Sequence, residues 1–145
     1  MTINNDSEFK VALSSLPSNS QRQVAARFAE SVLMLSKDAR VKTAIEAAKR
    51  TSISDDELDA AYKVAKKASV DSFTQCGKEC DWSSQAGHFV AQAALACFEP
   101  GNNTAWKSAM HARLARTSES IATGIGTDNT ESSAQYRILD KYLAE

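Results

Sequence analysis

The stretch AGHFVAQAALACF, residues 86–98, decides how this chain folds. Its large apolar side chains recur at helical spacing, and alanines fill most of the positions between them. That spacing is typical of an α-helix with a buried face, and the stretch lacks the strict alternation of a half-buried strand. Because small side chains let helix axes approach closely, we expect tight helix crossings around residues 86–97, and likewise around the alanine-rich residues 44–68.

Helical periodicity continues on both sides of this segment. On the C-terminal side, the turn EPGNN, residues 99–103, precedes a helix predicted from Thr104 to about Ala122 and another from about Glu131 to Ala144. On the N-terminal side, Asp81 or Ser83 is expected to start the helix that contains this segment. Before it, the capping-box pattern SDDE, residues 54–57, predicts a helix that runs to about Gly77.

Three further helices are expected in the first fifty residues. The first runs from Asp6 to Leu16 and ends at Pro17, which cannot continue a helix. The polar residues 18–20 offer caps for the second, and Asp38 offers one for the third. The sequence therefore predicts an all-α fold, a single-domain bundle of six to seven helices arranged as hairpins over residues 1–145, with residues 1–6 a flexible tail.

Composition excludes several classes of protein. A chain of 145 residues, 43% hydrophobic and 24% charged, is typical of one globular domain. Its 17 basic and 18 acidic side chains give a net charge of −1, which provides no general attraction to nucleic acid or to a membrane. The start, MTINNDSEFK, lacks the pattern of a signal peptide. We expect a cytoplasmic protein, and the sequence leaves open whether it forms a homo-oligomer.

Five soft side chains raise the question of a metal or catalytic site: Cys76, Cys80, Cys97, His88 and His111. Structural zinc sites usually need two close pairs of ligands, and the spacing here supplies only half of such a set. A C-x-x-x-C spacing without a βαβ context does not indicate a redox pair. A Cys–His hydrolase would require one of the cysteines to lie close to His88 or His111. Nothing in the spacing of these residues indicates such a contact. We therefore expect no cofactor, no bound metal and no catalytic residue.

Two segments together resemble the Imm5-like immunity proteins of bacterial toxin systems. In that family, an Asp-x-Arg segment leads into an Ala-Ile-Glu-Ala helix, and an Ala-Gly-His-x-Val-Ala motif follows an alanine-rich helix. The resemblance covers about residues 38–95. Departures are Val41, where the family tends to have proline, and Ala93–Ala94, where it tends to have a second histidine. The matching residues are Asp38, Arg40, Ala44, Ile45, Glu46, Ala47, Ala86, Gly87, His88, Val90 and Ala91.

The resemblance implies roles for five of these residues as a structural motif. Gly87 is expected to let another helix approach closely. His88 would then be a satisfied core histidine, hydrogen-bonded across the crossing to a carboxylate or backbone group. Asp38, which shares its segment with Arg40, and Glu46 are the candidate carboxylates for that bond.

The resemblance also implies a function. The chain would bind a cognate protein toxin and neutralise it by protein contact, without being an enzyme. Two alternatives stay open, a helical scaffold or adaptor and a Cys/His-based metal-binding or hydrolytic protein. Candidate partner contacts lie in the turn at 99–103 and in the loop TGIGTDNTESS, residues 123–133, because recognition often uses loops on a rigid scaffold. They are Glu99, Asn102, Asn103, Asp128, Asn129 and Glu131.

Overall fold

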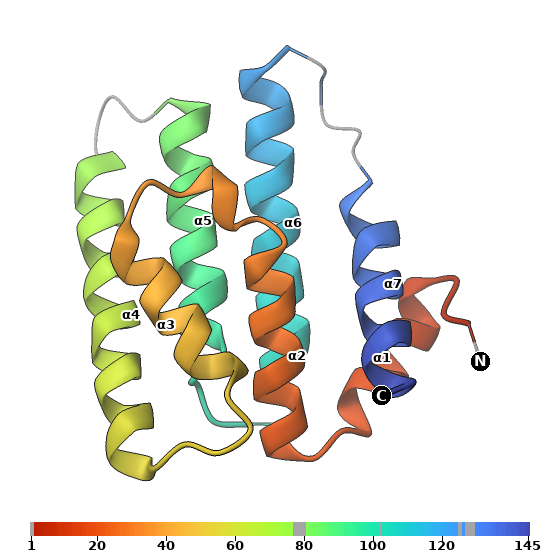
Figure 1. Cartoon of the computed structure of the whole chain (residues 1–145). Helices are drawn as coiled ribbons and strands as arrows, with labels where there is room; N and C mark the ends of the chain where they lie inside the picture. The colour runs from red at the N-terminus through yellow and green to blue at the C-terminus, as the bar shows by residue number, and fades with distance from the viewer. Residues whose placement is uncertain (1, 77–80, 102, 125, 127–129) are drawn as a thin grey trace.

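The computed structural model describes residues 2–76, 81–101, 103–124, 126 and 130–145, with only the backbone of Cys76. Within that part of the chain it contains seven α-helices, one short 3-10 helix and no strand, packed into a single domain, so the all-α prediction is confirmed (Figure 1). The elements are α1 (Asp6–Ser14), α2 (Ser18–Glu30), η1 (Leu33–Leu35), α3 (Ala39–Lys49), α4 (Asp55–Cys76), α5 (Trp82–Ala96), α6 (Thr104–Ala122) and α7 (Glu131–Leu143).

The helices form two layers with α5 at the centre. In Figure 1, α4, α5 and α6 stand in a row, α3 and α2 lie in front of them, and α1 and α7 lie beside α2 at the right edge. Helix α5 contacts α2, α3, α4 and α6. Close crossings were expected around residues 86–97, and the helix that holds most of them is the central one.

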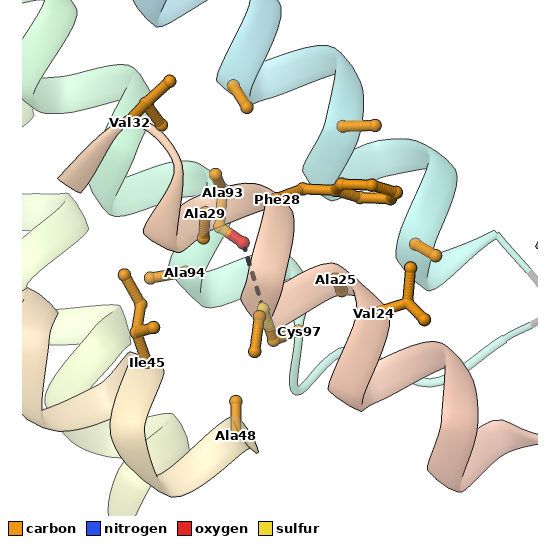
Figure 2. Packing of buried hydrophobic residues seen from close by; sticks show 14 of the residues in the cluster. Val24, Ala25, Phe28, Ala29, Val32, Ile45, Ala48, Ala93, Ala94 and Cys97 are labelled. Atoms are coloured by element: carbon orange, nitrogen blue, oxygen red, sulfur yellow. Dashed lines mark hydrogen bonds between the residues drawn. The ribbon is translucent and has the colours of Figure 1, made fainter. Parts of the chain in front are cut away.

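Small side chains make this close packing possible. Val24 and Phe28 of α2, and Val32 between α2 and η1, are fully buried in one core with alanines of α3, α5 and α6 (Figure 2). The hydroxyl oxygen of Ser108 on α6 lies 2.9 Å from the Ala25 carbonyl oxygen of α2. It also lies 3.0 Å from the Ala93 carbonyl oxygen of α5. Three backbones therefore meet around one small side chain.

Cys97 belongs to the same core. Its thiol donates to the carbonyl oxygen of Ala93 on the preceding turn, at 3.4 Å (Figure 2). Burial raises the pKa of this thiol to about 12, so the side chain is a small neutral core residue.

Three predicted helix starts are confirmed by their capping bonds. The Asp38 carboxylate accepts from the backbone N–H of Arg40 at 3.0 Å. The Asp81 carboxylate accepts from the backbone N–H of Ser84 at 2.7 Å. Ser54 caps α4, since its hydroxyl oxygen lies 3.1 Å from the backbone nitrogen of Glu57. Local hydrogen bonding thus determines where α3, α4 and α5 begin.

Other details of the sequence prediction are wrong. Residues 18–20 are not caps, because α2 begins directly after Pro17 and has no side-chain cap. Leu114 of α6 and Leu143 of α7 are about half exposed, although their spacing from Met110 and Leu139 favours a buried face in the predicted helices.

Residues 2–6, expected to form a tail, have contacts to the rest of the domain in the structure. Ile3 is only 5% exposed, and its backbone N–H donates to both carboxylate oxygens of Asp140 on α7 at 3.2 Å. Asn5 caps α1 by accepting from the backbone N–H of Glu8 at 2.9 Å. Met1 lies outside the described residues.

Candidate functional site

A pocket of about 850 Å³ opens where the N-terminal end of α3, the C-terminal half of α4 and the N-terminal half of α5 meet. These ends lie together at the upper left of Figure 1. The pocket is lined by Asp38, Arg40, Gly87 and His88, which come from both segments of the family pattern. Glu46 does not line it; its carboxylate is exposed and pairs with Lys42 on the same helix, at 4.0 Å.

Arg40 lies between two carboxylates in this pocket. Its guanidinium contacts Asp38 through Nη2 at 2.7 Å and through Nε at 3.0 Å. Nη1 contacts Asp71 of α4 at 2.8 Å. These bonds from Arg40 hold the pKa of both carboxyl groups below their usual range. The ion pairs fix the orientation of the guanidinium group and join α3 to α4.

His88 is bonded to α4, and not to either predicted carboxylate. Its Nδ1 atom lies 2.7 Å from the hydroxyl oxygen of Ser72. Partial burial lowers the pKa of the imidazole. Its ring centroid is 5.8 Å from that of Phe73, which stays largely exposed. The prediction of a satisfied histidine is therefore confirmed. The two candidate carboxylates are not its partners, because Asp38 is bonded to Arg40 and Glu46 is paired with Lys42.

A serine and a histidine in hydrogen-bonding contact can form a catalytic pair, so the direction of this bond matters. The Ser72 hydroxyl also lies 2.9 Å from the carbonyl oxygen of Ser69, which can only accept. The Ser72 hydroxyl proton can go to the Ser69 carbonyl or to Nδ1 of His88, so the direction of the bond depends on the tautomer of the imidazole. The backbone of Ser69 also raises the pKa of His88, against the larger lowering by burial. The pair is a cross-link between α4 and α5.

Gly87 has a smaller role than predicted. A Cβ atom at this position would lie 3.5 Å from the carbonyl oxygen of Leu35, an ordinary van der Waals distance. The backbone that passes over Gly87 is the end of the 3-10 helix η1, at Leu35 and Ser36. The position therefore has room for a methyl group.

The remaining soft residues do not converge in the described structure. Cys97 is buried in the core, His88 faces the pocket, and the Nδ1 atom of His111 is buried without a hydrogen-bond partner. Among the described residues, no group of three or more His, Cys, Asp and Glu side chains could hold a metal ion. The Cys76 side chain and Cys80 lie outside the described residues.

Among the described residues, the predicted partner contacts lie outside the pocket that contains His88. Glu99 lines a second pocket, of about 600 Å³, at the opposite end of α5, and Asn103 is exposed nearby. Glu131 was expected to be exposed, which is wrong: it is 3% exposed and bonded to Arg116 at 3.3 Å and to the Ser31 hydroxyl at 2.8 Å. The other three candidates, Asn102, Asp128 and Asn129, lie outside the described residues.

Sequence reasoning missed the contribution of α4 to the site. Asp71, Ser72 and Phe73 supply an ion-pair partner, a histidine partner and an exposed aromatic ring. The available signal was the change from alanine and lysine to the polar and aromatic DSF at residues 71–73, near the end of the alanine-rich helix.

Comparison of the chain with known protein families, curated proteins and solved structures finds no match. Over the described residues, none of the helices combines the length and the apolar character needed to cross a membrane.

Proposed function

We propose that this chain is an immunity-type protein that binds a cognate protein toxin and neutralises it by contact instead of by catalysis. The observation that carries the proposal is the meeting of Asp38, Arg40, Gly87 and His88 in one pocket, although the two segments are far apart in the sequence. A concave pocket in which a few polar groups converge is the usual form of a binding site.

The polar side chains of the pocket are already held by hydrogen bonds, which favours binding of a partner over catalysis. Arg40 is bonded on both sides by Asp38 and Asp71, and His88 is bonded to Ser72. Groups already held in place lose little entropy on binding, so they present a fixed pattern of charge to a partner. Complementary charges across an interface mostly accelerate association and select the partner.

The apolar contribution would come from the outer face of α4. Phe73 is 69% exposed and lies against the ring of His88. Val70, one turn earlier, is also exposed. Exposed aromatic residues beside a pocket frequently supply most of the energy of a protein interface once they are covered. We therefore place the centre of the toxin-binding surface at Phe73.

The experiment requires the toxin gene that neighbours the gene for this chain. The two proteins are co-expressed and purified, and calorimetry measures the Kd of the complex. Phe73→Ala should weaken binding by about tenfold or more, since loss of an interface anchor of this kind costs more than about 1.4 kcal/mol. The matched control is Val11→Ala, an exposed apolar residue of α1.

Two outcomes would contradict the proposal, one its function and the other the position of its interface. If the intact protein does not bind the toxin, the immunity function is wrong. If Phe73→Ala binds normally and Glu99→Ala does not, the interface lies at the opposite end of α5, beside the second pocket.

A further inference from the structure

Helix α1 lies in a groove formed by three other helices. Phe9 is fully buried, and its ring centroid lies 5.5 Å from that of Phe28 on α2, 6.1 Å from that of Trp106 on α6 and 5.3 Å from that of Tyr136 on α7. The guanidinium carbon of Arg113 lies 5.6 Å from the centroid of the same ring. We call this site, lined by Phe28, Trp106, Arg113 and Tyr136, the α1 groove.

A carboxylate of α1 binds at the end of the groove. Asp6 accepts from two nitrogen atoms of Arg113, at 2.8 and 2.9 Å. It also accepts from the hydroxyl of Tyr136 at 2.6 Å. Leu13, one turn after Phe9, is buried as well. The three residues Asp6, Phe9 and Leu13 therefore share one face of α1, at the spacing by which amphipathic helices bind in grooves.

The groove side of this contact has its own support. Arg113 donates through Nε to the amide oxygen of Gln135 at 2.8 Å. Gln135 is fully buried and donates to the carbonyl oxygen of Ala109 at 2.8 Å. Helices α6 and α7 thus hold the guanidinium group in position by a bond that does not involve α1.

Helix α1, by contrast, resembles a bound ligand. It has nine residues, and an isolated helix of that length is unstable in water. A short link that ends in Pro17 joins it to α2, and Val11 on its outer face is 65% exposed. Its attachment therefore depends on the face that carries Asp6, Phe9 and Leu13.

We propose that the α1 groove is a helix-binding site, which α1 occupies within the same chain and which accepts a partner helix with the same Asp-x-x-Phe-x-x-x-Leu pattern. The partner helix would place its carboxylate on Arg113 and Tyr136, and its aromatic ring between Phe28 and Trp106. This site is separate from the proposed toxin-binding pocket, which lies on the other side of α2 (Figure 1).

The test uses the full chain with Phe9→Ala, which loosens α1, and a fluorescein-labelled peptide of residues 2–16 with the natural sequence. Fluorescence anisotropy should show saturable binding. The wild-type chain should bind the peptide at least about tenfold more weakly, because its own α1 occupies the groove and only the open fraction of molecules can bind. The control peptide carries Asp6→Asn and Phe9→Ala and should bind at least about tenfold more weakly to the variant chain.

A second chain variant, Asp6→Asn, keeps Phe9 and removes only the charge that binds Arg113. It should bind the peptide more tightly than the wild-type chain does. Circular dichroism checks that both variants keep their helices. The proposal is wrong if a folded variant fails to bind the peptide or binds both peptides equally. It is also wrong if both variants unfold, since α1 would then be required for the fold and could not be displaced.

Discussion

Ser108 is a single residue at which α2, α5 and α6 meet. It is fully buried, and its hydroxyl group contacts the backbones of Ala25 and Ala93. We expect Ser108→Val to destabilise the protein by about 1–3 kcal/mol, because the added methyl groups force closely packed backbones apart. Urea unfolding measures the change. Ser133→Val, on the exposed side of α7, is the control and should change the free energy by less than about 0.5 kcal/mol.

Ser72 gives a second prediction for a single residue. Ser72→Ala removes the partner of His88 and should reduce the free energy of unfolding by about 1 kcal/mol, the usual net value of one hydrogen bond. Ser83→Ala is the control, since Ser83 lines the same pocket and is exposed. Equal effects of the two substitutions in urea unfolding would mean that the bond between Ser72 and His88 adds no stability.

The same histidine marks the limit of prediction from the sequence. The pattern AGH predicted that His88 would be satisfied across a crossing, and it is. Its partner depends on how far α4 and α5 are shifted along each other, which no local pattern determines. Asp38 was the expected partner, but it caps α3 and binds Arg40 two residues away. Local bonds of this kind form with little loss of chain entropy, so they occupy the carboxylate first.

Among the elements, α4 allows the clearest test of a helix start. Ser54→Ala removes the side chain that accepts from the backbone N–H of Glu57. The loss of an N-cap should cost about 1 kcal/mol and lower the Tm by about 2–4 °C for a chain of this size. A thermal scan measures the shift. Ser52→Ala, an exposed residue in the same turn, should leave the Tm unchanged; an equal shift in both variants would contradict the capping role.

The start of a helix could be predicted from the sequence where a side chain nearby caps it. It could not be predicted where contacts with distant residues determine the start. Asp38, Ser54 and Asp81 confirm this, since each bonds a backbone N–H two or three residues ahead. Helix α2 lacks such a cap. Instead, the buried amide oxygen of Gln21 in its first turns accepts from the backbone N–H of Ala105 on α6. That contact spans most of the chain, so the serines nearby were a misleading signal.

For the whole molecule, two histidines predict how stability depends on pH. Burial lowers the pKa of both His88 and His111 relative to the unfolded chain, so the folded state favours their neutral forms. Their contribution to stability is therefore complete above about pH 6.5, the pKa of an unperturbed histidine, and is lost as the pH falls through their folded-state pKa values. The urea midpoint should be lower at pH 5.0 than at pH 7.5.

Substitution separates this effect from other titrations. His111→Phe should reduce the pH dependence between 7.5 and 5.0, because burial lowers the pKa of His111 by more than the nearby Glu99 raises it, and its buried Nδ1 atom has no hydrogen-bond partner. The paired carboxyl groups of Asp6, Asp38 and Asp71 have lowered pKa values and titrate below this range. An unchanged slope in His111→Phe would place the effect elsewhere.

The all-α architecture could be predicted from the sequence, whereas the positions of α1 and α7 relative to each other could not. The helical period predicted an all-α bundle, and the alanines of residues 86–98 predicted close helix crossings. Nothing local indicated that α1 and α7 lie side by side, because residues far apart in the sequence make the contacts. Asp6 and Phe9 of α1 both contact Tyr136 of α7, and Ile3, before α1, is bonded to Asp140.

The bond between Ile3 and Asp140 joins residues separated by 137 positions. Contacts between distant positions form late in folding, because the intervening chain must first be brought together. Among the helices of the described residues, α1 leaves the ribosomal exit tunnel before the others and α7 after them. Phe9 therefore lacks the ring of Tyr136, and Asp6 lacks its hydroxyl donor, until α7 has emerged. While the helices between them are synthesised, α1 has no complete site in which to fold.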